Sequence, residues 1–281
     1  LFLLPGIAFV LLFCYGPMYG LVVAFKDYKI SKGILGSPWA NPWYNNFAMM
    51  FKDKKFNAAF FNTIRMGLAY IITGFPGPII LALLLNELRS RHYKNTLQVI
   101  YTFPNFLSWV IVGGLMTTIF AGEGVINSLI RASGGQTYGF LTDKSLIRPL
   151  LYATSIWKGT GWSAILYLAG IAGISPELYE AAEVDGAYIT WPEIRSTAVI
   201  LLILAFGGIM SKGYDQILNM TNAVVRDAAE TIDTYIYRIT FQEKPKYGFS
   251  TAIGLSKSVI NFAFLLLANK LAKALGEGGI M

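Results

Sequence analysis

Residues 3–25, LLPGIAFVLLFCYGPMYGLVVAF, decide the class of fold, because they carry no charged side chain over their whole length. About 20 apolar residues in a helix span the hydrocarbon core of a bilayer. The run is too long for the apolar region of a signal peptide, so we interpret it as a retained membrane helix. Of the 281 residues, 54% are hydrophobic and 14% charged, against about 25% charged in soluble domains. Together with a mean hydropathy of +0.51, this predicts an integral membrane protein.

Outward from this stretch, five further apolar runs predict an all-α integral membrane protein with six transmembrane helices. Two runs are interrupted only by Lys158 and Lys257, and a single charge inside a span usually faces the protein interior. Prolines and glycine pairs within the runs predict kinked helices packed in a bundle. The expected spans are residues 3–25, 66–86, 95–122, 149–175, 196–211 with an extension toward Gln216, and 247–269.

Composition also excludes several classes of function. The net charge of +7 is spread between apolar blocks and forms no continuous basic face, so we expect no nucleic-acid binding. The chain has one cysteine, Cys14, and one histidine, His92, so we expect neither a Cys/His metal cluster nor a Ser-His-Asp catalytic triad. No G-x-x-x-x-G-K-[ST] segment is present. The sequence therefore predicts no catalytic residue, no metal site and no cofactor bound by this chain.

Basic residues predict the orientation of the spans. Residues 87–94 carry Arg89, Arg91 and Lys94 against one acid, and the positive-inside rule places them and both termini in the cytoplasm. The loops at about 26–56, 122–148 and 217–247 are then extracytoplasmic. The first of these loops conflicts with the rule, because its six lysines and two aspartates give a net charge of +4. Either the orientation is inverted or this loop is basic for a reason of its own.

Residues 176–187, PELYEAAEVDGA, predict a short surface helix in the loop 176–193. A proline at the first turn is preset for a helix, Ser175 can cap it, Glu177 complements the helix dipole and Gly186 can end it.

One flank of this helix lacks bulk at Ala181 and Ala182, while Glu180 and Asp185 place acids around it. Such a flank suits close docking into a groove of a partner protein. An ordinary amphipathic connector is the alternative.

This segment resembles the E-A-A-x-x-D-G-A signature, followed by I-x-L-P, of the membrane subunits of bacterial binding-protein-dependent ABC importers. Other segments resemble the carbohydrate branch of polysaccharide and lipoprotein-type, maltose-importer-like sugar permeases, which includes an alginate importer. They are IWKGTGW at 156–162, GYDQI at 213–217, TIDTYIYR at 231–238 and LAKALGE at 271–277. The resemblance covers essentially the whole chain.

The resemblance implies a type I ABC importer permease fold, a single transmembrane permease domain over residues 1–281, and multi-pass insertion in the bacterial inner membrane. It implies a second permease subunit in a heterodimer, two cytoplasmic ATPases that hold ATP and Mg, an extracytoplasmic solute-binding protein, a saccharide substrate and contact with membrane lipid. It assigns the coupling to the ATPases to Glu180, Ala181, Ala182, Asp185 and Gly186.

The coupling loop departs from the family at one point. Only five residues lie between Gly186 and Pro192, where the family usually has several more, including aromatic and basic side chains. Either residues are missing from the sequence here or the loop is shortened, and the second alternative predicts weaker docking.

A sugar path requires polar groups inside the membrane and aromatic faces on which rings can stack. The candidates are Trp157, Lys158, Trp162, Asp215, Gln216, Lys257 and Asn261. For Lys158 an internal ion pair or a snorkelling cation is the alternative, and for Asp215 and Gln216 structural hydrogen bonding is favoured. The basic first loop, with Lys158 and Lys257, hints at an acidic, uronate-containing cargo, although a solvated lysine-rich loop would give the same charge.

Two other classes of function remain as alternatives. An ion-coupled secondary sugar transporter needs intramembrane acids and often an internal repeat, whereas the expected spans contain lysines and no carboxylate. An integral-membrane carbohydrate enzyme needs a carboxylate pair, which Asp215, Asp227, Glu230 or Asp233 would have to supply. These acids are better explained as loop and cap residues.

Overall fold

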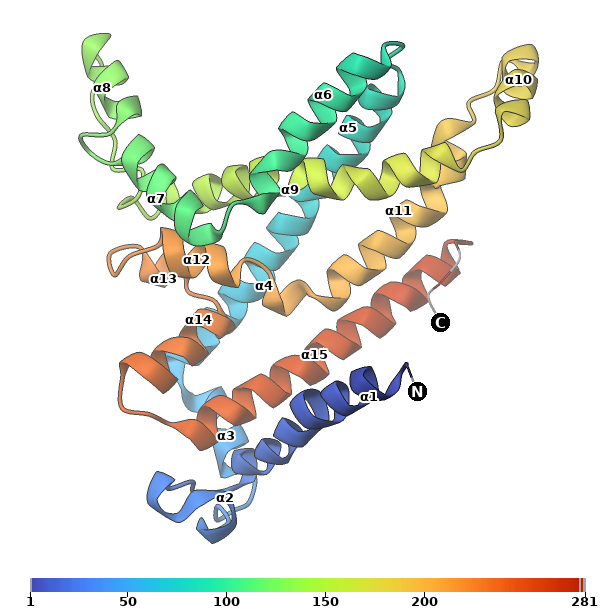
Figure 1. Cartoon of the computed structure of the whole chain (residues 1–281). Helices are drawn as coiled ribbons and strands as arrows, with labels where there is room; N and C mark the ends of the chain where they lie inside the picture. Colours follow the sequence, from blue (N-terminus) through green and yellow to red (C-terminus); the bar gives the residue numbers. More distant parts are fainter. Residues whose placement is uncertain (1, 278, 280–281) are drawn as a thin grey trace. The chain divides into compact units, whose positions relative to one another are not determined.

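A computed structural model of the chain describes residues 2–277 and 279, and every regular element in them is a helix (Figure 1). The chain divides into two compact units. Unit 1 consists of Leu1–Phe61 and Thr231–Ile260, and unit 2 of Asn62–Glu230 and Asn261–Met281. Helices α4 (Lys54–Gly74) and α15 (Tyr247–Ala274) contribute to both units. The prediction of a single permease domain over residues 1–281 stays a prediction.

Unit 1 begins with a continuous helical segment that ends where Lys26 adopts an extended backbone. The Asn46 amide donates hydrogen bonds to the carbonyls of Ala24 (2.9 Å) and Lys26 (3.2 Å), which fixes this end to α3. The elements of unit 1, besides its parts of α4 and α15, are α1 (Leu4–Val10), a π-helical turn (Leu11–Tyr15), a 3-10 helix (Gly16–Phe25), a 3-10 turn (Ile30–Lys32), α2 (Gly33–Gly36), α3 (Asn45–Lys52), α14 (Ile232–Tyr237) and a π-helical turn (Arg238–Gln242).

Unit 2 is organised around α9 (Ile147–Ala172), which packs against α5, α6, α11 and α12. Its other elements are α5 (Pro76–Asn86), α6 (Arg91–Thr102), a 3-10 turn (Phe103–Phe106), α7 (Trp109–Phe120), α8 (Val125–Ala132), α10 (Pro176–Asp185), α11 (Thr190–Gly207), a 3-10 turn (Ile209–Ser211), α12 (Tyr214–Met220) and α13 (Arg226–Ala229). Figure 1 shows α10 at the far end of α9 and α11, away from α7 and α12.

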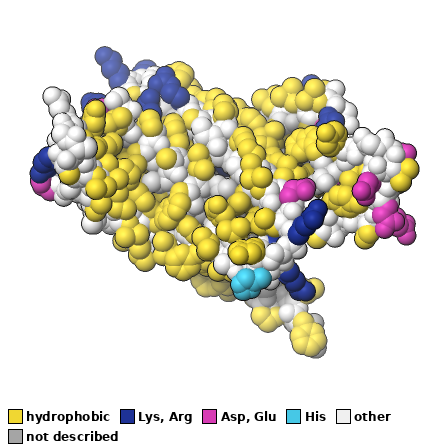
Figure 2. Space-filling model, turned by 90° about the horizontal axis from the view of Figure 1, so that it is seen from above, with side chains coloured by type: hydrophobic (Ala, Val, Ile, Leu, Met, Phe, Trp, Pro, Cys, Tyr) yellow, Lys and Arg dark blue, Asp and Glu magenta, His cyan; other side chains and the backbone are white. Residues whose placement is uncertain are grey.

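Within residues 2–277 and 279, five helical segments are long and apolar enough to cross a membrane. They are Leu4–Phe25, Lys54–Asn86, Trp109–Ala132, Thr190–Gly207 and Tyr247–Ala274. On the face drawn in Figure 2, hydrophobic side chains are spread over the surface and charged side chains are few, which suits a lipid environment. The predicted all-α membrane fold is confirmed. The count of six spans stays a prediction, because α9 has the length but carries Lys158 and several small polar residues.

Two predicted spans are wrong as continuous helices. The span 95–122 is divided into α6 and α7, because the 3-10 turn Phe103–Phe106, with Pro104 near its start, follows α6, and Leu107 and Ser108 are extended. The Ser108 hydroxyl then caps α7 by accepting the N–H of Ile111 at 3.3 Å. The extension of the fifth span toward Gln216 is the separate helix α12, which begins after a left-handed turn at Gly213 (φ +78°).

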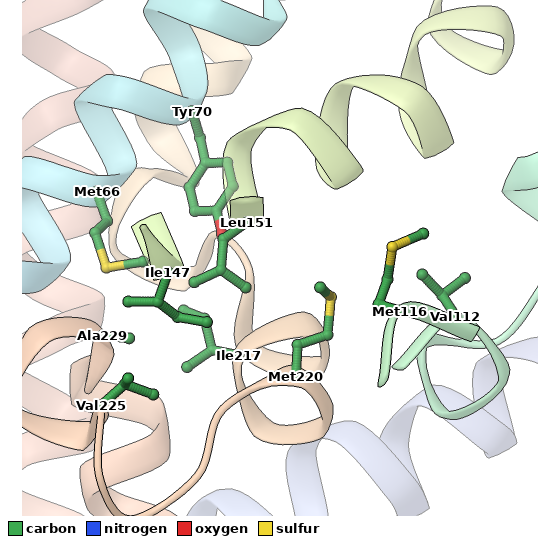
Figure 3. Close-up of a cluster of buried hydrophobic side chains, with 10 residues drawn as sticks. All are labelled: Met66, Tyr70, Val112, Met116, Ile147, Leu151, Ile217, Met220, Val225 and Ala229. Atoms are coloured by element: carbon green, nitrogen blue, oxygen red, sulfur yellow. The ribbon is translucent and has the colours of Figure 1, made fainter. Parts of the chain in front are cut away.

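The core of unit 2 lies where α4, α7, α9 and α12 meet. Figure 3 shows its side chains: Met66, Tyr70, Val112, Met116, Ile147, Leu151, Ile217, Met220, Val225 and Ala229. Glycines bring the helix backbones close together here. A Cβ at Gly161 of α9 would lie 2.0 Å from the carbonyl oxygen of Tyr101 in α6, and a Cβ at Gly113 of α7 would lie 2.7 Å from that of Asn219 in α12. These close approaches, typical of helix packing in membranes, hold α9 against α6 and α7 against α12.

Candidate coupling helix and transport cavity

The surface helix predicted from residues 176–187 is present as α10, Pro176–Asp185. Pro176 occupies its first turn with Glu177, and Gly186 ends it in the left-handed conformation (φ +67°). The amide of Ala187 then donates to the carbonyl of Ala182 at 2.8 Å. The predicted capping by Ser175 is wrong in one respect: Ser175 holds the N-cap position, but its side chain makes no capping hydrogen bond. The fixed φ of Pro176 is sufficient to start the helix.

The predicted coupling residues are accessible on α10. Glu180, Ala181, Asp185 and Gly186 are exposed and Ala182 is half-buried. In Figure 2, Asp and Glu side chains gather at the end of the molecular face where Figure 1 places α10. The helix therefore offers an acidic surface with a small-residue flank, which is the arrangement expected for docking to a partner. The docking itself stays a prediction.

One side-chain contact joins α10 to the membrane helix that follows it. The hydroxyls of Tyr179 and Thr190 lie 3.2 Å apart and connect α10 with the first residue of α11. Helices α9 and α11, which precede and follow α10, pack against each other around the buried Ile171 and Ile194. The chain enters α10 from α9 and leaves it into α11, so α10 is covalently linked to both members of this pair. The transmission of a displacement through α10 stays a prediction.

The end of the chain lies beside the start of α11 within unit 2. Arg195 of α11 forms an ion pair with Glu277, whose side chain is only 14% exposed. The C-terminal segment and the loop that holds α10 are therefore at the same end of α11. The sequence predicts that both are cytoplasmic, and the pairing agrees with that common location.

Unit 2 contains a cavity of about 440 Å³ between α4, α5, α9, α11 and the turn that precedes α12. On α9 its wall includes Ser155, Gly159 and Ser163, which are spaced by four residues and share one helix face. Their small side chains leave the space open. The other polar and aromatic lining residues are Tyr70, Thr73, Phe75, Thr160, Tyr167 and Lys212. Hydroxyl groups and aromatic rings are the groups that a saccharide requires.

The three candidates on α9 do not line this cavity. Trp157 and Trp162 are 45% and 49% exposed on other faces of the helix. Lys158 is buried, and its Nζ donates to the carbonyl of Asn105 at 2.7 Å and lies 5.4 Å from the ring centre of Trp109. The expectation that Lys158 is internal is correct, but its partners are a carbonyl and an indole rather than an acid.

The candidates on α12 and α15 mostly have internal partners. In unit 1, Lys257 pairs with Asp233 at 2.5 Å. In unit 2, Asn261 accepts the N–H of Met210 at 3.0 Å, while Asp215 is exposed at the start of α12.

Gln216 is fully buried and hydrogen-bonded at both ends of its amide. Its Oε1 accepts the Tyr70 hydroxyl at 2.9 Å, and its Nε2 donates to Leu151 O at 2.6 Å and to Thr154 Oγ1 at 2.7 Å. The structural interpretation that the sequence favoured for Gln216 agrees with these bonds.

Sequence reasoning missed Lys212 and the small-residue face of α9. In the sequence, Lys212 is the charged residue that ends the apolar run 196–211. Nothing in the sequence indicates that its side chain lies inside unit 2. The small residues Ser155, Gly159 and Ser163 do carry a signal, their spacing of four within an apolar run.

The chain resembles known membrane proteins over its whole length. The family of binding-protein-dependent transport system inner membrane components matches residues 74–277. The polygalacturonan/rhamnogalacturonan transport system permease protein YteP of Bacillus subtilis (strain 168) is 40% identical over 288 residues, which include 100% of this chain and 89% of YteP. Protein LplB of the same organism is 40% identical over 292 residues, with coverage of 100% and 90%.

Two solved structures of bacterial transporters show the same similarity. A chain in the crystal structure of a bacterial ABC transporter involved in the import of the acidic polysaccharide alginate has a TM-score of 0.88 and 36% identity, covering 97% of this chain and 94% of that one. A second structure, of a bacterial alginate ABC transporter in complex with an alginate pentasaccharide-bound periplasmic protein, has the same TM-score at 35% identity, covering 99% and 95%. These matches, with the apolar helices and the surface helix α10, establish that the chain belongs to the family of binding-protein-dependent transport system inner membrane components.

Proposed function

We propose that the chain is the permease subunit of an ATP-driven importer for an acidic oligo- or polysaccharide, and that the cavity of unit 2 is part of the translocation path. The observation that carries the proposal is the family match together with extensive similarity to permeases of polysaccharide transport. The family consists of transport subunits, so neither an enzyme nor an ion-coupled transporter is supported.

The acidic character of the cargo is supported by two independent relatives. Polygalacturonan, in the description of YteP, and alginate, in the description of the solved structures, are both polymers of sugar acids. The cavity contributes a further argument, since hydroxyl groups and aromatic rings on its wall are accompanied by the cation of Lys212. A carboxylated sugar could meet all three kinds of group.

The proposal includes the partners that the sequence predicts. A second permease subunit, forming a heterodimer with this chain, would complete the path, and two cytoplasmic ATPases that hold ATP and Mg would dock on α10. An external solute-binding protein would deliver the cargo, which agrees with the solved alginate transporter, where such a protein is bound. Coupling would then be mechanical, because α10 lies between α9 and α11 in the chain and the Tyr179 hydroxyl contacts that of Thr190 in α11. The membrane is the bacterial inner membrane, with both termini in the cytoplasm.

Purification and reconstitution test this proposal. The tagged chain should bring a nucleotide-hydrolysing subunit and a second permease out of its native membrane. In proteoliposomes, this complex should accumulate labelled tetragalacturonate only when ATP is enclosed and the binding protein is present outside. Uptake by the purified chain alone, or a complex that hydrolyses ATP without accumulating any saccharide, would contradict the proposal.

A further inference from the structure

Lys212 is the charged residue on the wall of the cavity. It follows the 3-10 turn Ile209–Ser211 and lines the same cavity as the small-residue face of α9, Ser155, Gly159 and Ser163. Of the lining residues that the structure describes, it alone carries a charge, and no hydrogen bond or ion pair to another described residue engages its side chain. The side chain is also only partly exposed to solvent. The cation is therefore confined in the cavity without an internal counter-ion.

The backbone on both sides of Lys212 is held firmly. Before it, Asn261 accepts the N–H of Met210 at 3.0 Å and donates to the Ser211 hydroxyl at 3.4 Å. After it, Gly213 adopts the left-handed conformation, and a Cβ there would lie 3.0 Å from the ring of Tyr70. Only glycine accepts this conformation readily. The turn thus presents Lys212 from a defined position, which a flexible surface lysine would not have.

The other internal cations of unit 2 are already engaged. Lys158 donates to Asn105 O and stacks near Trp109, as described above. Arg148 donates from Nε to Ala228 O at 2.7 Å and from a terminal nitrogen to Asn62 Oδ1 at 2.8 Å. These side chains stabilise the fold. Lys212 differs from them because its donors are free to bind a ligand.

We infer that Lys212 is a specificity-determining residue of the transport path: it binds a carboxylate of the saccharide in the cavity and thereby favours acidic over neutral cargo. The inference rests on the proposed function and deepens it. A cation that is partly removed from water regains its lost hydration interactions when an anion binds, and a charge-assisted hydrogen bond is stronger than a neutral one. A neutral sugar would leave the ammonium without this compensation.

The test compares one cargo with and without its charge in the complete importer. Proteoliposomes that contain the full complex, with binding protein outside, are supplied with tetragalacturonate or with its methyl ester. Discrimination by the binding protein is the same for each permease variant, so the change in the uptake ratio reports on the permease alone. Lys212→Met and Lys212→Gln should lower the ratio of acid to ester about tenfold, the factor expected for one hydrogen bond to a charged group. Lys212→Arg should retain most of the ratio.

Lys158→Met is the matched control, because it removes a buried cation that does not line the cavity. It should reduce uptake of both cargoes equally or weaken the complex. An unchanged ratio in both neutral Lys212 variants would overturn the inference while leaving the importer assignment intact. Loss of assembly in both would assign Lys212 to the fold, or to an acid of the second permease, and would also overturn it. Failure of the wild-type complex to transport tetragalacturonate would instead refute the proposed cargo.

Discussion

Replacing Gly161 by alanine should separate α6 from α9 and destabilise unit 2. An added Cβ would lie 2.0 Å from the carbonyl oxygen of Tyr101, 2.2 Å from its carbonyl carbon and 2.7 Å from the amide nitrogen of Thr102. All three atoms belong to the backbone of α6, so no side-chain rotation can relieve the contact. The helices must therefore move apart, and this movement would also disturb the nearby hydrogen bond from Lys158 to Asn105 O.

The magnitude follows from two opposing effects. Overpacking of this kind costs about 1–3 kcal/mol and sometimes more, and a backbone contact at 2.0 Å belongs at the upper end of that range. Alanine in a helix interior regains about 1 kcal/mol over glycine. Gly159 is the matched control: it lies in the same helix, and a Cβ there meets nothing within 4 Å. Gly159→Ala keeps the gain without the clash, so the two variants should differ by about 3 kcal/mol in free energy of unfolding.

Thermal unfolding followed by circular dichroism in detergent measures this difference. The Tm of Gly161→Ala should lie about 5–10 °C below that of Gly159→Ala. Stability is the required measurement, because Gly159 lines the cavity and its replacement can alter transport without altering the fold. Equal Tm values for the two variants would show that α6 and α9 do not approach each other at Gly161, and the argument from backbone contact would be wrong.

Three further predictions concern the coupling helix, the orientation and the extracytoplasmic side. Glu180→Lys or Gly186→Trp should abolish ATPase association and transport while the chain still inserts into the membrane. The control Glu123→Lys breaks only an exposed ion pair and should change neither property. Unaltered saccharide-stimulated ATP hydrolysis in both α10 variants would rule out the coupling role. In a Cys14→Ser background, Lys32→Cys should react with an impermeant thiol reagent applied outside and Arg91→Cys should not, and the reverse pattern would invert the topology. Burial raises the pKa of Asp53, but hydrogen bonds from the Phe56 amide, the Tyr235 hydroxyl and the Lys55 amide, with the charge of Lys246, hold that pKa below its ordinary value. The stabilisation of the folded chain by the ionised Asp53 is therefore complete above the unfolded-state pKa of about 4 and is lost as pH falls through the lower folded-state pKa. The Tm of the wild type should exceed that of Asp53→Asn by a constant amount near neutral pH, and this difference should vanish in strong acid. A pH-independent difference in Tm would contradict the stabilising role of the Asp53 carboxylate.

The length of the apolar runs and their lack of charge predicted the helical class, and turn chemistry predicted the coupling helix. Pro176 and Gly186 act through their own backbone preferences, which are local properties and can be read from the sequence. The division of the span 95–122 into two helices was not predicted, because an uncharged run does not indicate whether the backbone continues as one helix after Pro104 or changes direction. Its bend depends on the packing of α6 and α7 against other elements of unit 2, which only the tertiary structure specifies.

The lysines show most clearly where sequence reasoning about the transport path ends. An intramembrane charge is expected to face the protein interior, and that rule holds for Lys158 and Lys257. An interior position, however, includes both packed contacts and cavities, and hydropathy does not separate them. The difference lies in the partner: Asn105 O for Lys158, Asp233 for Lys257 and no described protein group for Lys212. A cation whose donors are already bonded would have to lose those bonds to hold a cargo carboxylate, whereas Lys212 gains one. Selectivity for acidic saccharides should therefore depend on the lysine that the hydropathy pattern placed outside every span.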